Sequence, residues 1–139
     1  MQHTFDHTQS FNQDISSWNI SSLTNMSNMF LNADSFNQSI SNWDARSLID
    51  MKGFIFKGRQ RSERYELLGI QFPVFQSRYL FMNVSSVTNM KAMFLNDYAF
   101  NQNISPWNVA SVTDFRLMLY GASAFDQDIS SWNVSAARA

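Results

Sequence analysis

The sequence predicts an α/β solenoid, a stack of coils of about 25 residues in which each coil contributes one short parallel strand and one short helix. The first observation is a recurring Phe-Asn/Asp-Gln motif, which begins at Phe11, Phe36, Phe100 and Phe125. The interval between the first two copies equals the interval between the last two. The second observation is that apolar residues keep the same place in each copy. Such a period is typical of stacked repeats, because a coil buries its apolar side only against its neighbours.

The predicted strand of each coil follows this motif and carries apolar residues at spacings of three, two and three. The second apolar column consists of Trp18, Trp43, Met82, Trp107 and Trp132. The third column consists of Ile20, Ala45, Val84, Val109 and Val134. This spacing reproduces the L-x-x-L-x-L pattern of leucine-rich-repeat-like coils, with Trp in the second position. We therefore expect parallel strands at 18–20, 43–45, 82–84, 107–109 and 132–134.

A short helix is predicted after each strand, because the apolar period changes there. Met26, Met29 and Phe30 lie at positions i, i+3 and i+4, which is one face of a helix. The same spacing recurs at 90–94 and at 115–119. A polar return loop then leads to the next Phe motif.

Short polar side chains occupy the positions between the apolar columns of the predicted strands. Side chains alternate along a strand, so these residues face outward. They form a candidate partner-binding face that comprises Ser17, Asn19, Ser21, Asp44, Asn83, Asn108 and Asn133. Such ladders of polar side chains can bond to one another, which is a structural use, or present a flat surface to a partner. Few aromatic or Arg anchors lie on this face, so we expect weak affinity that gains strength only from many coils.

The most regular copy of the repeat runs from Phe11 to Phe30 and reads Phe-Asn-Gln-Asp-Ile-Ser-Ser-Trp-Asn-Ile-Ser-Ser-Leu-Thr-Asn-Met-Ser-Asn-Met-Phe. It resembles the repeat of the BspA-like leucine-rich-repeat surface proteins and the similar repeat of mycoplasma surface lipoproteins. The resemblance covers roughly four of five coils. It implies a secreted or surface-displayed module that mediates adhesion or protein binding, has no enzymatic activity, and has proteins or cell-surface macromolecules as partners. It assigns no binding residues.

The chain is predicted to be one solenoid over residues 1–139 of about five coils, with a non-repeat insertion near 57–74. The interval from Phe36 to Phe100 is longer than two full periods of the repeat, so additional sequence lies between them. The insertion is either a functional loop, with Arg59, Arg61 and Arg64 as candidate binding residues, or an artefact such as a translated intron. We expect it to protrude and trypsin to cut there first.

Composition excludes several classes of protein. A net charge of −1 argues against a nucleic-acid or anionic-membrane partner attracted by bulk electrostatics. The chain has no cysteine, so neither disulfides nor thiolate metal sites are expected. No apolar run approaches the length that a membrane-spanning helix requires, so no membrane span is predicted. Met1 and Phe5 fall in register with Met26 and Phe30, so both ends of the chain are expected to be truncated repeats.

No catalytic, cofactor-binding or metal-binding residues are predicted. His3 and His7 flank Asp6, but a third strong metal ligand is missing from the sequence nearby. Asp14 and Asp128 are interpreted as caps of turns. The Phe residues of the repeated motif are interpreted as a buried stack and not as a sugar-binding ladder. The alternative to a binding module is a structural spacer array or an intracellular scaffold without a dedicated ligand.

Overall fold

The computed structural model describes residues 1–33, 35, 36, 38, 40, 42–54, 82–98 and 100–138. The predicted insertion at 57–74, including Arg59, Arg61 and Arg64, lies outside the described residues.

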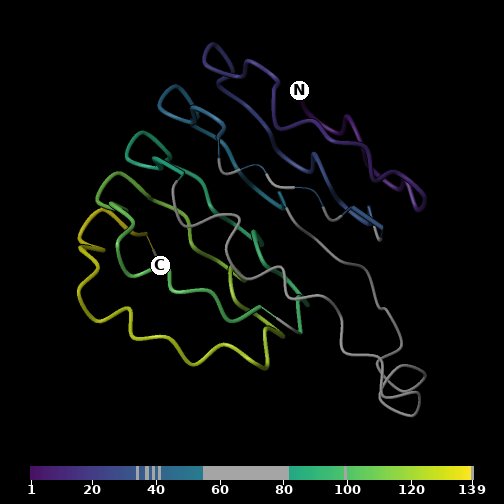
Figure 1. The fold of residues 1–139 in the computed structure, drawn as a ribbon. Coiled ribbons are helices and arrows are strands. Elements are labelled where there is room, and N and C mark those ends of the chain that lie inside the picture. Colours follow the sequence, from purple (N-terminus) through teal and green to yellow (C-terminus); the bar gives the residue numbers. More distant parts are fainter. Residues whose placement is uncertain are drawn as a thin grey trace.

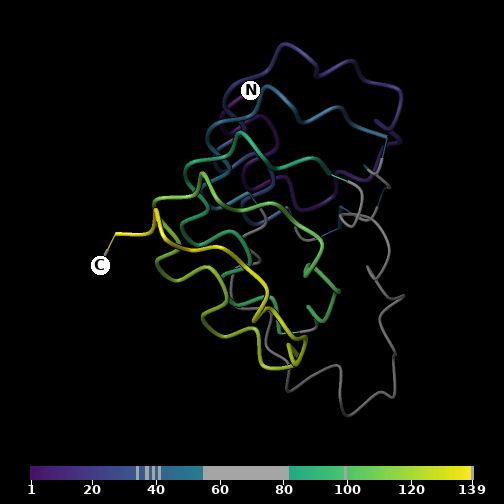
Figure 2. The ribbon, with the colours of Figure 1, turned by 90° about the vertical axis from the view of Figure 1, so that its left-hand side faces the viewer.

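The chain forms a stack in which residues one repeat period apart in the sequence lie side by side (Figures 1 and 2). We call the successive turns of this stack layers 1 to 5, defined as 1–25, 26–50, 51–54 with 82–89, 90–114 and 115–138. Layers are joined by backbone hydrogen bonds in which alternate amides donate to carbonyls one turn of the stack later. The amides of Asn28 and Phe30 in layer 2 donate to the carbonyls at 52 and 54 in layer 3, at 2.8 and 3.2 Å. The amides at 90–96 bond to 114–120 in the same way.

The predicted α/β solenoid of strands and helices is wrong. Across the described ranges the backbone forms no helix, and extended pairing is limited to isolated parallel bridges. These bridges join Asn25 to Asp50, Asp50 to Asn89, and Asn89 to Asp114. None of the predicted strand segments at 18–20, 43–45, 82–84, 107–109 and 132–134 is a strand. Each layer is instead a succession of tight turns.

The apolar spacing of three marks the two ends of a β-turn and not a strand. The amide of Trp18 donates to the carbonyl of Ile15 at 3.1 Å, and that of Leu23 donates to Ile20 at 2.8 Å. Equivalent bonds close the turns at 40–43, 84–87, 104–107, 109–112 and 129–132. A bond from residue i+3 to residue i defines a closed β-turn, whose two central residues project away from its ends. In the inner layers the ends of these turns are therefore buried, as Ile104 and Trp107 are, while a central residue such as Pro106 stays at the surface.

The predicted helices do not form, because each predicted segment contains a residue with a positive, left-handed φ. Asn28 and Asn32 have φ values of 54° and 55°. Positive φ recurs at the equivalent positions, namely His3, His7, Gly53, Ala92, Asn96, Leu117 and Gly121. A residue in this region cannot continue a right-handed helix. The amide of Met29 accordingly bonds to Met26 three residues back, and neighbouring amides bond to the next layer.

The core is a set of stacked columns that run through the layers. Ile40, Leu48, Met51 and Phe54 are completely buried in the middle of the stack. The Phe residues of the repeated motif also stack, as the sequence predicted, with ring centroids 5.8 Å apart for the pair at 11 and 36 and 5.6 Å apart for the pair at 100 and 125. Burial of these columns, and not regular secondary structure, is what fixes the period of the repeat.

Candidate partner-binding face

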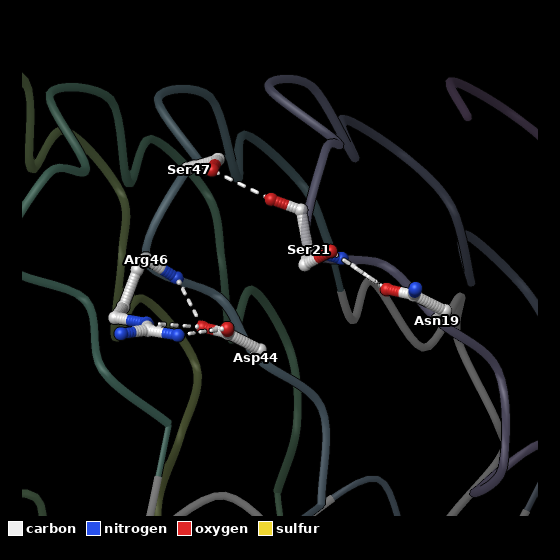
Figure 3. Close-up of polar contacts among 5 residues, drawn as sticks. All are labelled: Asn19, Ser21, Asp44, Arg46 and Ser47. Carbon is white, nitrogen blue, oxygen red and sulfur yellow. Dashed lines mark hydrogen bonds and ion pairs between the residues drawn. The ribbon is translucent and has the colours of Figure 1, made fainter.

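The predicted face exists as an exposed polar row, but it lies on turns and not on strands. Its main members occupy one position in successive layers, and we call them the Asx column: Asn19, Asp44, Asn83, Asn108 and Asn133. All are exposed except Asp44, which is half-buried. Ser17 and Ser21 are exposed beside Asn19. Figure 3 shows the first two layers of this row.

Each member of the Asx column closes the turn that follows it. Oδ1 of Asn19 accepts the amide of Ser21 at 3.0 Å, and Oδ1 of Asn108 accepts the amide of Ala110 at 3.2 Å. Asn83 and Asn133 make the same bond to residues two positions later. This is the Asx-turn, in which a short side chain replaces a backbone acceptor. The Oδ1 atom of each Asx-column residue is therefore already used as an acceptor within its own turn.

The Nδ2 amides of this column point outward without an internal acceptor. Within the described chain, Nδ2 of Asn19, Asn83, Asn108 and Asn133 donates no hydrogen bond. An Asn side chain carries two N–H donors in addition to its carbonyl oxygen. The column therefore presents hydrogen-bond donors in layers 1, 3, 4 and 5, whereas Asp44 supplies no donor in layer 2.

Two further columns repeat the same chemistry on other corners of the stack. Asp14 and Asp128 accept the amides of Ser16 and Ser130 at 2.9 Å, which confirms their predicted role as caps of turns. These backbone hydrogen bonds lower the pKa of both carboxyl groups. A third column, consisting of Asn25, Asp50, Asn89 and Asp114, caps the turns that begin at the parallel bridges.

The arginines near the candidate face are paired within their own turns. Arg46 binds Asp44 through two hydrogen bonds, from Nε to Oδ1 at 2.8 Å and from Nη2 to Oδ2 at 2.6 Å (Figure 3). Arg116 binds Asp114 in the same way at 3.0 and 2.7 Å. The Arg46 side chain lowers the pKa of Asp44 to about 2, and Arg116 does so for Asp114. The positive charges of Arg46 and Arg116 are therefore largely neutralised by Asp44 and Asp114 within the chain itself.

Other polar side chains of this region hold neighbouring layers together. The hydroxyl of Ser47 donates to the carbonyl of Ser21 at 2.6 Å (Figure 3). The hydroxyl of Thr113 donates to the carbonyl of Thr88 at 3.1 Å, and that of Thr88 donates to Ile49 at 3.3 Å. Part of the polar surface thus has the structural use that the sequence left open.

The histidines near the amino terminus join layers 1 and 2. Nδ1 of His3 and Nδ1 of His7 approach the two oxygens of Asp6 at 2.8 and 2.5 Å. Their Nε2 atoms lie 3.2 Å from Nδ2 of Asn28 and 2.9 Å from Nδ2 of Asn32. In the part of the chain that the structure describes, no group of three or more His, Cys, Asp or Glu side chains is placed to hold a metal ion.

A basic row beside the third column was missed in the sequence. Lys52, Lys91 and Arg116 each follow a capping Asp or Asn by two residues and donate their amides to it. Recurrence of a basic residue two positions after Asp or Asn was the available signal. The row lies one residue per layer in layers 3 to 5; Arg116 is paired with Asp114, so Lys52 and Lys91 supply the added positive charge beside the capping side chains.

Among the described residues, no helix is long and apolar enough to cross a membrane.

Comparison with known proteins gives one family. A family model described as "Mycoplasma protein of unknown function, DUF285" matches residues 1–66 and 72–139. Neither the curated proteins nor the solved structures contain a significant match.

Proposed function

The chain belongs to the family described as "Mycoplasma protein of unknown function, DUF285", and from that premise we propose that it is a non-enzymatic repeat module that binds macromolecular partners. The family description names no activity. The resemblance of the repeat at 11–30 to BspA-like surface proteins supports a finer proposal, namely a secreted or surface-displayed module that mediates adhesion or protein binding.

The observation that carries the proposal is the row of outward Nδ2 donors in the Asx column. Their carbonyl oxygens are fixed by the turns, so the donors are held in place before a partner binds. Adjacent chains of hydrogen-bonded backbone are about 4.8 Å apart, which sets the spacing of the row. The donors of Asn83, Asn108 and Asn133 lie in three successive layers, so they match a partner with evenly spaced acceptors, such as backbone carbonyls or sugar oxygens.

Each contact in this row should be weak. Arg46 and Arg116 are engaged by their own Asp partners, so they are poor anchors for a second protein. A neutral hydrogen bond contributes only about 0.5–1.5 kcal/mol after exchange with water. Useful affinity then requires many layers or many copies acting together.

The test compares binding of the labelled chain and of a tandem form to intact cells and to purified surface polysaccharide. The variant is Asn19→Asp with Asn108→Asp and Asn133→Asp, which keeps Oδ1 for the turns and removes the outward donors of these three residues, leaving only that of Asn83. Its matched control changes three exposed amides elsewhere to acids: Gln9→Glu, Gln13→Glu and Asn103→Asp. Both variants gain the same charge.

We expect the tandem form to bind more tightly than the single chain, and the Asx-column variant alone to lose binding. Equal binding by single and tandem forms would remove the multivalent interpretation. Binding that survives the Asx-column variant, and also the triple change of Asn19, Asn108 and Asn133 to Ala, would place the site on the 57–74 segment or elsewhere.

A structural spacer array is the second candidate function. The hydroxyl bonds of Ser47 and Thr113 to neighbouring layers favour it, because they use polar side chains internally. Failure of both single and tandem forms to bind any surface would support the spacer.

A further inference from the structure

Three members of the Asx column begin the sequence Asn-x-Ser, which is the acceptor motif for N-linked sugar. They are Asn19, Asn83 and Asn133, in layers 1, 3 and 5. All three are exposed, and Asn83 belongs to an inner layer, so this exposure does not depend on where the stack begins or ends. The capping bond does not require the Ser, because Asn108 caps the same turn with Ala110 at that position.

The Asx-turn directs the two polar atoms of each Asn side chain to opposite sides. The backbone amide of the Ser donates to Oδ1 at 3.0 Å for Asn19 and at 3.1 Å for Asn83 and Asn133. At Asn19 the hydroxyl of Ser21 also donates to Oδ1, at 2.7 Å. Nδ2 therefore faces solvent, and it donates no hydrogen bond to a described residue.

The bonds to Oδ1 also favour chemistry at Nδ2. A carboxamide nitrogen is a poor nucleophile, because its lone pair is delocalised onto the carbonyl oxygen. When Nδ2 loses a proton, negative charge develops on Oδ1, and donors already directed at that oxygen stabilise the charge. At Asn19 the backbone amide and the hydroxyl of Ser21 are two such donors. Asn108 has only the amide, because Ala110 carries no hydroxyl.

Two other copies of the motif among the described residues are poorer acceptors. Nδ2 of Asn25 donates to Oδ2 of Asp50 at 3.4 Å, and Ser27 is only 8% exposed. Asn103 is exposed, but Pro106 follows its Ser directly and restricts the backbone conformations that this Ser can adopt in a transferase. The fold therefore favours the three motifs of the Asx column.

We propose that Asn19, Asn83 and Asn133 are sites of N-linked glycosylation. The co-substrate is a sugar whose anomeric carbon is activated by a phosphate ester, carried on a nucleotide or on a lipid, and a transferase catalyses the reaction. Nδ2 forms a bond to the anomeric carbon, and the bond from that carbon to the phosphate oxygen breaks. Its electron pair leaves with the phosphate, and one proton of Nδ2 passes to a base of the transferase.

This modification does not rest on the proposed binding function, because sugar transfer requires only that Nδ2 is accessible. It acts on the same surface, however. Sugar on Asn19, Asn83 and Asn133 would cover the Asx column and leave only the Nδ2 donors of Asn108 uncovered.

The experiment offers the folded full chain to transferases in two arms. One arm contains UDP-glucose and a soluble N-glycosyltransferase, and the other contains a lipid-pyrophosphate-linked oligosaccharide and a membrane-bound N-glycosyltransferase. Mass spectrometry then locates the sugar. We expect transfer to Asn19, Asn83 and Asn133 in at least one arm, and the arm that succeeds identifies the class of donor. Absence of transfer to all three residues in both arms would overturn the proposal.

Asn25 separates the effect of the fold from that of the motif. Asn19 and Asn25 lie on one tryptic peptide, because the first Lys or Arg of the chain is Arg46. We expect a tryptic digest to be modified at both residues at similar rates. In the folded chain we expect transfer to Asn19 to be at least about tenfold faster, because Asn25 becomes accessible only through local opening. Equal rates at the two residues of the folded chain would refute the role of the Asx-turn.

Exchanging Ser and Ala within the column provides matched variants. Ser135→Ala keeps the turn amide and removes only the hydroxyl, so we expect transfer to Asn133 to fall at least about tenfold. Ala110→Ser adds the hydroxyl, so we expect Asn108 to become a fourth acceptor. In the protein purified from the cells that produce it, the three asparagines should carry sugar. Unmodified peptides at all three positions would contradict the proposal.

Discussion

Gly53 packs directly against Asn28 of the preceding layer, so closely that a Cβ atom added to Gly53 would collide with Oδ1 of Asn28. Both residues have a left-handed backbone, with φ values of 58° and 54°. The same relationship recurs between Gly121 and Asn96, where an added Cβ would lie 2.5 Å from Oδ1. Left-handed positions therefore stack in register, and the side chain in one layer limits the residue in the next.

Gly53→Ala should destabilise the chain. A left-handed backbone costs an Ala about 1–2 kcal/mol, and displacing the Asn28 side chain adds to this. We expect the free energy of unfolding from urea titration to fall by about 2 kcal/mol. An unchanged free energy would show that this turn is not left-handed in solution.

Ala92→Gly, at the same position in layer 4, should have the opposite effect. Ala92 has a φ of 55°, a conformation that Gly adopts without strain. The relief of about 1–2 kcal/mol is partly offset by the greater freedom of Gly in the unfolded chain. We expect a net stabilisation of about 0.5–1 kcal/mol in the same titration. Destabilisation by this change would contradict the positive φ.

Trp107→Ala should be among the most damaging single changes. The side chain is 5% exposed and lies 6.2 Å from the ring of Phe94 in a stacked arrangement. Removing a buried Trp costs about 3–5 kcal/mol. Trp18→Ala provides the comparison within the same column and should cost clearly less, because Trp18 is 38% exposed. A denaturation midpoint unaffected by Trp107→Ala would mean that this column is not core.

The sequence predicts the period and the buried columns of this fold but not its local conformation. Ile40 and Trp43 are buried, as their three-residue spacing indicates, yet that spacing fits both a repeat strand and the ends of a β-turn. Likewise Met26, Met29 and Phe30 are buried with helical spacing although the chain makes turns. Apolar spacing indicates which side chains are buried, but it gives no information on the sign of φ.

A better sequence signal for the turns was present at the positions that have a positive φ. Gly53 shares its position with Asn28, and Gly121 shares its position with Asn32. Gly and Asn are the residues that most readily adopt a left-handed backbone, so their alternation in one column argues against a helix. Ala92 and Leu117 in the same column carry no such preference, which weakens the signal in layers 4 and 5.

The exposure of the polar row was predicted from the sequence and its capping role was missed, while its role in binding a partner stays a prediction. That Asn19 and its equivalents are exposed follows from the polar pattern. Their capping role does not follow from the strand prediction, because an Asx-turn requires a turn immediately after the Asn. The pairing of Arg46 with Asp44 depends on the same turn, which brings residues two apart within hydrogen-bond distance.

Asn108 allows the capping role to be separated from the outward donor. Asn108→Ala removes the acceptor of the Ala110 amide and should cost about 0.5–1.5 kcal/mol of unfolding free energy. Asn108→Asp keeps that acceptor and should be nearly neutral for stability at pH 7, as Asp44 shows by occupying the same position. Equal losses for the two variants in thermal or urea unfolding would argue against the Asx-turn.

Asp44 and Asp114 should make the fold sensitive to acid. Each carboxyl group has a folded-state pKa of about 2, lowered from an ordinary value of 3.8 mainly by its hydrogen-bonded Arg46 or Arg116. A group with a lowered pKa binds protons more readily in the unfolded chain. Its contribution is therefore fully present above about pH 4 and is lost as the pH falls toward 2.

Replacing these Asp residues by Asn tests the pH dependence without disturbing the turns. Asn89 already makes the same capping bond that Asp114 makes one layer later. We expect the thermal midpoint of the native chain to fall between pH 4 and pH 2, and the double variant Asp44→Asn with Asp114→Asn to show a shallower fall. Some slope should remain, because Asp14 and Asp128 also have lowered pKa values. Asp126→Asn is the control, as Asp126 forms no ion pair with a described residue. A double variant with a slope as steep as that of the native chain would show that the two arginine pairs do not form in solution, since their loss is what the titration in this range would otherwise report.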